Sequence, residues 1–142
     1  MKNYTIILLL FIASIGASCS FQNKVAQKKE VLDREAFVDS ISEPNVQLLD
    51  IRTPMEYEND GHFQNAENID YESDNFYSKV EKNFDKAKPL YLHCKGGIKS
   101  QKASNELLDK GFEKVYVLKG GYDDWTPEMQ AEKKAEMKKK NK

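Results

Sequence analysis

Short, mostly apolar runs alternate with stretches of helical periodicity along the central part of the chain. The runs at 46–51, 66–69, 89–93 and 114–118 are predicted to be strands. Helices are predicted to begin at Asp33 and at Thr53-Pro54, to cover 73–84 and 100–110, and to end with a short helix through Trp125. Because strands that alternate with helices form parallel βαβ units, we expect an α/β fold in three layers. Its central, mainly parallel sheet should carry helices on both faces.

Several of these boundaries have a local sequence signal. Asp33 is of a type that caps helices, and Pro54 suits the first turn of the next helix. Gly111 follows the helix predicted over 100–110 and should end it. A globular domain is therefore predicted over 31–126. The Lys- and Glu-rich tail at 127–142 is predicted to be a solvated helix outside this domain.

The first eighteen residues have the pattern of a secretory signal peptide. Lys2 gives a positive start, and the uncharged, mainly apolar run at 6–17 is too short to span a bilayer. Small residues at 16–18 lead directly into Cys19, and this arrangement resembles the lipobox of bacterial lipoproteins. The resemblance implies that 1–18 is a signal peptide and that Cys19 is lipidated. The stretch at 19–30 would then be the lipidated cysteine and a polar tether.

This N-terminal pattern also predicts a location. A lipid on Cys19 would make the membrane a partner and would hold the domain in the bacterial cell envelope, facing the periplasm. The alternative is ordinary cleavage near residue 18. That would leave Cys19 as a free thiol in a soluble secreted or periplasmic protein.

Composition excludes several classes of function. The chain has 142 residues, enough for one domain. Its 22 Lys and Arg residues balance 23 Asp and Glu residues, and a net charge of -1 argues against nucleic acid as a partner. Two cysteines cannot form a disulfide-dense scaffold or a four-thiolate metal site. No cluster of His and Cys suggests a metal, and no organic cofactor is expected.

The most informative segment lies between the strand at 89–93 and the following helix. It consists of Cys94, Lys95, Gly96, Gly97, Ile98, Lys99 and Ser100. The two glycines let the backbone curl and present consecutive N–H groups inward, next to the positive end of a helix. The two lysines add cationic side chains. Together these groups should favour the thiolate of Cys94, make it a nucleophile, and hold an anion beside the sulfur.

This loop resembles the active-site loop of rhodanese-like sulfurtransferases, with its Cys-x-x-Gly-x-Arg-Ser pattern. The resemblance continues in Asp50-Ile51-Arg52, Glu56-Tyr57 and Gly61-His62. It continues again in the closing segment from Gly111 through Gly120-Gly121 to Trp125, so that it covers about 31–126. One departure is Lys99 in place of the usual Arg, which keeps the charge but loses the planar fork suited to an oxyanion.

The resemblance implies a sulfurtransferase. Cys94 would take the outer sulfur of thiosulfate or of a persulfide, hold it as a persulfide, and pass it to a thiol or cyanide. The partners implied are therefore a small sulfur donor and a thiol acceptor. Residues 95–100 would bind the anion or the persulfide, and Asp50, Arg52 and Glu56 would have supporting roles.

Three other functions compete with this one. A phosphatase or arsenate reductase of this fold carries five residues between Cys and Arg, whereas four separate Cys94 from Lys99. A thiol redox protein is disfavoured because no second Cys accompanies Cys94 in a Cys-x-x-Cys. A non-catalytic binding module or a persulfide carrier on the same fold stays open as the alternative. His93 is predicted to be structural, because neighbouring residues of a strand point to opposite faces.

Overall fold

The computed structural model describes residues 26–124 and the single residues 131, 135 and 139. Within this part, five strands form one sheet in the order β1-β5-β4-β2-β3, and every neighbouring pair is parallel. The strands are β1 (Lys28–Leu32), β2 (Gln47–Asp50), β3 (Glu67–Asn68), β4 (Leu90–His93) and β5 (Lys114–Leu118). The predicted parallel α/β sheet is therefore confirmed.

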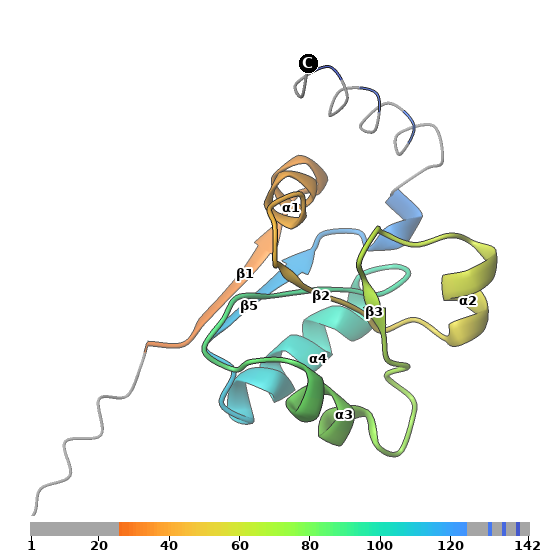
Figure 1. Cartoon of the computed structure of the whole chain (residues 1–142). Helices are drawn as coiled ribbons and strands as arrows, with labels where there is room; N and C mark the ends of the chain where they lie inside the picture. The colour runs from red at the N-terminus through yellow and green to blue at the C-terminus, as the bar shows by residue number, and fades with distance from the viewer. Residues whose placement is uncertain (1–25, 125–130, 132–134, 136–138, 140–142) are drawn as a thin grey trace, which may run out of the picture.

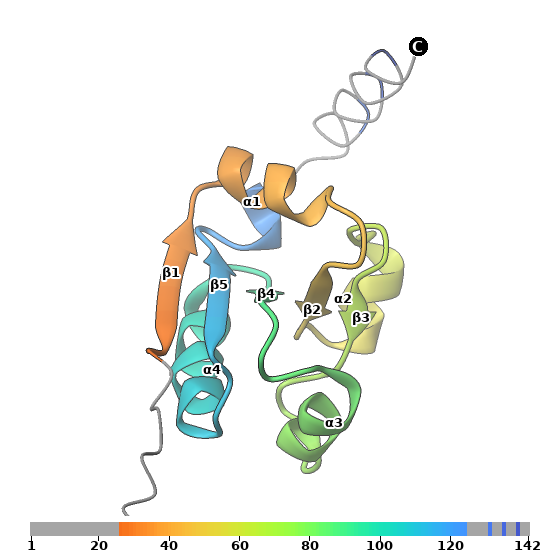
Figure 2. The same ribbon diagram turned by 60° about the vertical axis from the view of Figure 1, so that its left-hand side comes forward.

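Helices cover both faces of the sheet, which completes the predicted three layers (Figures 1 and 2). The helices are α1 (Arg34–Ile41), α2 (Pro54–Asn59), α3 (Phe76–Asn83), α4 (Ile98–Asp109) and the 3₁₀ helix η1 (Tyr122–Asp124). One buried cluster includes Phe37 of α1 and Leu48 of β2, and the other includes Val80 of α3, Leu107 of α4 and Leu49 of β2. Neighbouring strand residues thus feed two separate cores, as alternation along a strand requires.

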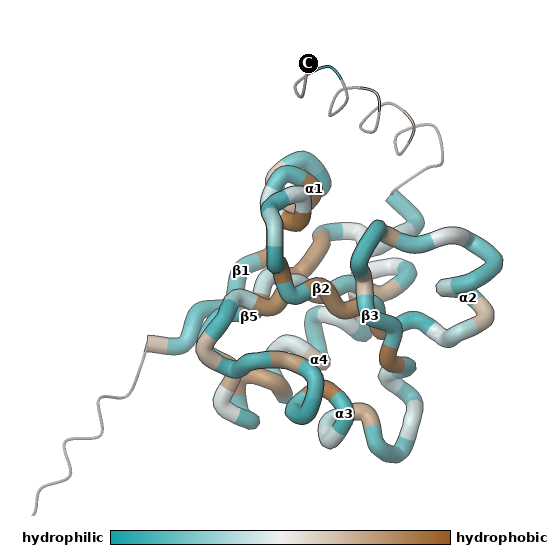
Figure 3. Tube along the Cα trace, viewed as in Figure 1, coloured by the Kyte–Doolittle hydropathy of each residue, from teal (hydrophilic) through white to brown (hydrophobic). Residues whose placement is uncertain are grey.

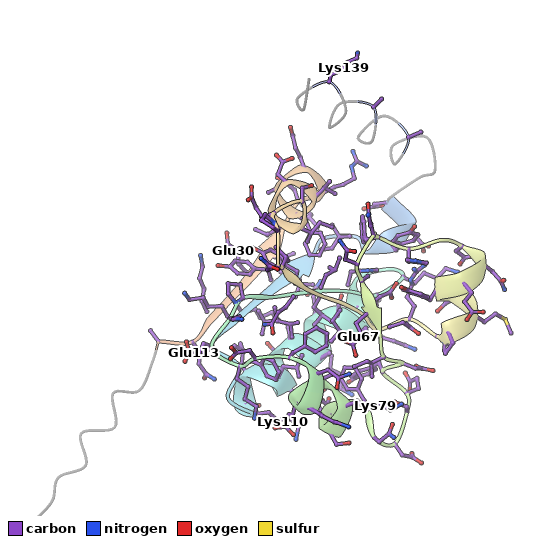
Figure 4. All side chains as sticks on the ribbon, in the orientation of Figure 1. Glu30, Glu67, Lys79, Lys110, Glu113 and Lys139 are labelled. Atoms are coloured by element: carbon purple, nitrogen blue, oxygen red, sulfur yellow. The ribbon has the colours of Figure 1, made fainter. Side chains whose placement is uncertain are left out.

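The hydropathy of the chain separates the central strands from the loops. Figure 3 shows hydrophobic segments gathered on the central strands, while the loops around α2 are hydrophilic. The charged side chains labelled in Figure 4, such as Lys79, Lys110 and Glu113, lie around the outside of the ribbon. No helix among the described residues is long and apolar enough to cross a membrane.

The predicted helix signals act as expected, with small shifts at some ends. The Asp33 side chain accepts a hydrogen bond of 2.9 Å from the N–H of Ala36. Thr53 and Glu56 cap α2 reciprocally, each accepting from the backbone N–H of the other. Helix α4 begins two residues before the predicted start, because Gly97 turns the chain into it. Helix α3 begins later than predicted, at Phe76, whose N–H donates to the Ser73 carbonyl in a preceding turn.

Strand β1 begins inside the stretch that is predicted to be a tether. The tether was expected to extend through residue 30, yet Lys28–Leu32 forms β1 and pairs along its length with β5. Charged residues are common on edge strands because they discourage pairing with other chains, so the pattern of β1 resembles a linker. The predicted signal peptide at 1–18 and the predicted lipidation site Cys19 lie outside the described residues, as does Trp125. In the tail, Ala131, Ala135 and Lys139 are helical and exposed.

Candidate active site

Cys94 follows β4 directly, at the carboxyl edge of the parallel sheet. Its residue is 4% exposed, and it forms no disulfide with any residue that the structure describes. The N–H of Gly97 donates to Sγ over 3.1 Å. The thiol lies 3.4 Å from the Ser100 hydroxyl oxygen, and that hydroxyl in turn donates to the Gly97 carbonyl over 2.9 Å. The sulfur therefore lies inside a turn that offers it a main-chain donor and a hydroxyl.

The start of α4 supplies further donors near the sulfur. Gly97 is the N-cap residue and has a φ of 86°, a left-handed conformation that favours glycine. The first N–H groups of a helix have no intrahelical acceptor and lie at its positive end. The N–H groups of Ile98, Lys99 and Ser100 belong to this first turn. The predicted N–H cradle therefore has a structural basis, with Gly97 as the donor that contacts the sulfur.

A second segment holds this loop in place. The N–H of Tyr122 donates to the Cys94 carbonyl over 2.9 Å, and the N–H of Asp123 donates to the Lys95 carbonyl over 3.0 Å. Gly121 precedes them, and a Cβ built on it would lie 2.1 Å from the Lys95 carbonyl oxygen and 2.6 Å from the Gly97 nitrogen. Only glycine allows this approach, so the turn before η1 clamps the loop that carries the cysteine.

Each of the two loop lysines is paired with carboxylates. Lys95 Nζ lies 3.5 Å from a carboxylate oxygen of Glu56 and 3.8 Å from one of Asp60. Lys99 Nζ lies 2.8 Å from a carboxylate oxygen of Glu72. Both lysine side chains remain about half exposed, so the cationic surrounding of Cys94 stays a prediction, with its charge partly balanced by these carboxylates. Carboxylates on α2 and in the loop before α3 compete for the lysines, and such pairings between distant segments have no local sequence signal.

These ion pairs change the titration of their members. The hydrogen bond and charge of Lys99 lower the pKa of Glu72, and Glu72 in turn raises the pKa of Lys99. Partial burial acts to raise the pKa of Glu56. The hydrogen bonds from Thr53 and the charge of Lys95 outweigh it, so the pKa of Glu56 falls below its usual value. All three groups are therefore charged at neutral pH.

Asp50 and Arg52 form a buried pair beneath the loop. Their side chains are 0% and 1% exposed, and the guanidinium donates to both carboxylate oxygens over 2.6–3.0 Å. Arg52 also donates to the Gly61 carbonyl over 2.8 Å and stacks on the Tyr122 ring, 3.9 Å from its centre. The pair thus braces the turn after α2 and the segment that clamps Cys94. This placement fits the supporting role predicted for both residues.

His93 lies on the other side of the sheet from Cys94. Its ring packs against Phe63 and Tyr122, in the core that includes α1, whereas Cys94 belongs to the core of α3 and α4. Neither ring nitrogen makes a hydrogen bond to the described part of the chain, and Nε2 lies 3.6 Å from the Asp50 carboxylate. Burial lowers the pKa of His93 to about 4, although Asp50 opposes the shift. His93 is therefore neutral and is not a base for Cys94.

Sequence reasoning missed several parts of the site. Glu72 and Asp60 were not singled out, and Tyr122 was not recognised as a donor to the Cys94 carbonyl. The Gly120-Gly121 pair was the available signal for the clamp. Ile98 was included in the loop, but its 82% exposure could not be inferred. No group of three or more His, Cys, Asp or Glu residues within the described ranges could hold a metal ion.

The site can be compared with those of known proteins. The family model for the rhodanese-like domain matches residues 33–128. A rhodanese-like domain protein of Staphylococcus aureus has a similar crystal structure, with a TM-score of 0.59 and 25% sequence identity. The match covers 68% of this chain and 90% of that one.

Two relatives are similar in sequence. The tRNA uridine(34) hydroxylase of Pelagibacter ubique is 36% identical over 110 residues, which cover 78% of this chain and 35% of that protein. This chain therefore spans about a third of the length of the hydroxylase. The uncharacterized protein YqhL of Bacillus subtilis is 33% identical over 136 residues, 94% of this chain and 100% of that protein. The family match, the parallel fold and the cysteine loop agree, and the chain belongs to the rhodanese-like domain family.

Proposed function

We propose that the protein is a sulfurtransferase that carries sulfane sulfur on Cys94. One observation supports this above all: Cys94 Sγ lies in a glycine turn at the start of α4, and the N–H of Gly97 donates to it over 3.1 Å. Main-chain donors aimed at a sulfur stabilise the negative charge of a thiolate or of a persulfide. The carboxyl edge of a parallel sheet is also where ligands bind in folds of this class.

The transfer consists of two displacements. The Cys94 thiolate attacks the outer sulfur of the donor, so that an S–S bond forms on Sγ while the S–S bond of the donor breaks. Its electron pair leaves on the inner sulfur, as sulfite from thiosulfate or as a thiolate from a persulfide. An acceptor thiolate or cyanide then attacks the outer sulfur of the Cys94 persulfide and restores the thiolate. Ser100 can rotate its hydroxyl toward the charged sulfur during these steps.

A sulfur-loading assay tests this function. We expect the purified protein to gain one sulfur atom on Cys94 after incubation with thiosulfate or a persulfide, as seen by peptide mass spectrometry. Cys94→Ser should lose both this mass and sulfur transfer to cyanide. Cys19→Ser is the matched control, because it removes the other cysteine of the chain. Equal transfer by Cys94→Ser and the parent protein would refute the role of Cys94.

The alternative function is a binding module or a persulfide carrier without turnover. The near-complete burial of Cys94 and the pairing of both loop lysines favour it over a fast thiosulfate enzyme. The same assay separates these functions. A carrier gains sulfur on Cys94 but does not turn over repeatedly, and a binding module gains none.

We also propose that nucleic acid is not a partner, although the Pelagibacter relative is named for a tRNA substrate. The net charge of -1 and the carboxylates around the loop lysines oppose attraction to phosphates. Retention of tRNA on a filter at physiological salt would contradict this proposal.

The N-terminal pattern supports a lipid anchor on Cys19 and a place in the cell envelope. Mass spectrometry of the mature N-terminus should find an acylated Cys19. An unmodified N-terminus near residue 19 would instead support a soluble secreted or periplasmic protein.

A further inference from the structure

The carboxylates that hold the loop lysines form a collar around the sulfur loop. This carboxylate collar consists of Glu56 and Asp60, which contact Lys95, and Glu72, which contacts Lys99. Lys95 is the residue next to Cys94, and Lys99 is next to Ser100, whose hydroxyl contacts the sulfur. The collar therefore acts on the same loop that a donor must approach.

Charge in this region does not favour anions. Asp70 also acts on Lys99, and Lys102 acts on Glu72, so four carboxylates face three ammonium groups. Glu56 and Glu72 both have a lowered pKa, which keeps them charged through the neutral range. A dianion such as thiosulfate competes with a collar carboxylate for each lysine. Such a competition lowers affinity for anions without affecting a donor that does not need the lysines.

Apart from the two lysines, the side chain that the loop exposes is apolar. Ile98 lies between the two lysines in sequence, opens α4, and is 82% exposed. A donor molecule that approaches the loop thus meets one aliphatic side chain flanked by carboxylate–lysine pairs. A donor molecule that presents an ammonium or guanidinium group can pair with a collar carboxylate, whereas a donor with a carboxylate or sulfonate is repelled.

We infer that the carboxylate collar determines donor specificity, so that the site prefers a persulfide whose carrier presents a cationic group over an anionic sulfur donor. This inference rests on the proposed function and names its substrate class. The chemistry is the first displacement described above: a bond forms between Sγ and the sulfane sulfur, and the donor S–S bond breaks. The electron pair leaves on the inner sulfur of the carrier as its thiolate. No oxidant or reductant is consumed.

Two small persulfides of similar size test the inference. Cysteamine persulfide carries an ammonium group, and 3-mercaptopropionate persulfide carries a carboxylate in its place. We expect kcat/KM for loading Cys94 to be several-fold higher with the cysteamine donor at low salt. This preference should shrink as salt screens the collar, since the Debye length falls to about 8 Å at physiological ionic strength.

The variant Glu72→Gln removes the collar carboxylate that contacts Lys99. It should lower the preference by about threefold and should raise kcat/KM for thiosulfate by a similar factor, within the range for exposed ion pairs. The matched control is Glu81→Gln, because Glu81 forms a similar exposed pair with Lys86, in the segment that leads into the amino end of β4. Thermal unfolding of both variants checks that neither has lost the fold.

The outcomes separate the two proposals. If neither persulfide nor thiosulfate loads Cys94, the proposed function fails. If both persulfides load Cys94 equally well, or if Glu72→Gln keeps the parental preference, the collar does not set specificity and the inference is overturned. A change of equal size in Glu81→Gln would also overturn it, because overall charge would then explain the effect.

Discussion

Asp50 and Arg52 show how a charged pair can serve the active loop without touching the sulfur. The pair is almost fully buried, and Arg52 links the turn at Gly61 to the ring of Tyr122. Tyr122 in turn donates its N–H to the Cys94 carbonyl. A buried ion pair contributes little to stability over an apolar replacement, but removal of one partner leaves an uncompensated charge. The pair therefore matters for the placement of the loop more than for attraction of an anion.

We expect Arg52→Ala to destabilise the protein by about 3–5 kcal/mol, because the Asp50 carboxylate is then left buried without its partner. Urea unfolding measures this loss. The double variant Asp50→Leu/Arg52→Met should be less destabilised than Arg52→Ala, since it leaves no buried charge. An Arg52→Ala protein that unfolds at the parental midpoint but loads sulfur slowly would instead assign Arg52 to anion binding.

His93 should make stability depend on pH. Its pKa is about 4 in the folded protein and near its ordinary value of 6.5 when unfolded, so the unfolded chain binds more protons between these values. The contribution of His93 to the free energy of unfolding is therefore complete above pH 6.5 and is lost as the pH falls toward 4. By pH 4 the loss is about 3 kcal/mol. The titratable and charged groups that face the ring are Tyr122, Asp50 and Arg52.

The variant His93→Leu should remove this part of the pH dependence, whatever its stability at pH 7. The measurement is the free energy of unfolding at several pH values between 7 and 4. His62→Gln serves as the control because His62 is the other histidine of the chain and is exposed. A His93→Leu profile parallel to that of the parent protein would show that His93 is not the titrating group.

At the scale of elements, the active loop depends on the turn that precedes η1. The loop precedes α4 and the turn follows β5. The two segments nevertheless pack so closely at Gly121 that a Cβ there would overlap the loop backbone. The two hydrogen bonds from Tyr122 and Asp123 hold this approach. A rigid loop keeps its donors in place for the charged sulfur, which lowers the cost of forming a thiolate or persulfide.

The variant Gly121→Ala tests this clamp. Its methyl group would overlap the Lys95 carbonyl oxygen, and the φ of 71° would add strain, so we expect a loss of at least about 2 kcal/mol in stability. Sulfur loading should fall as well. Gly96→Ala is the control for stability, because a Cβ on Gly96 meets nothing within 4 Å. Equal unfolding midpoints for the two variants would contradict the clamp.

Sequence reasoning succeeded where the signal was local. The cap at Asp33, Pro54 at the first turn of the next helix, and the apolar strands predicted most elements and the place of Cys94. It failed where the cause lay in distant segments. The charged strand β1 is specified by pairing with β5, and the lysine–carboxylate pairs of the loop join residues from different elements. These pairs balance the charges of Lys95 and Lys99, and no local pattern in the sequence predicts them.

At the scale of the whole molecule, β1 completes the sheet. Its backbone pairs with β5 along five residues, and Lys29 extends to Asn105 of α4 over 2.8 Å. Without β1, the apolar strand β5 would become an exposed edge open to pairing with other chains. We therefore expect the stable unit to include β1, which begins ahead of the predicted domain boundary at 31.

A truncated chain tests this boundary. We expect a chain that begins at residue 33 to aggregate or to unfold at a much lower temperature than one that begins at residue 26. Size-exclusion chromatography and thermal unfolding give the comparison. A monomeric protein with an unchanged midpoint after loss of 26–32 would mean that β1 is not part of the stable fold.

The direction of β1 also sets the orientation of the sulfur centre. The strands are parallel, so the described chain enters at the amino edge of the sheet, whereas Cys94 follows β4 at the carboxyl edge (Figure 1). The length of β1 separates these edges by about 15 Å. A surface that held the chain close to residue 26 would lie nearer the amino edge than the edge that carries the sulfur. The sulfur would then face molecules that arrive from solution.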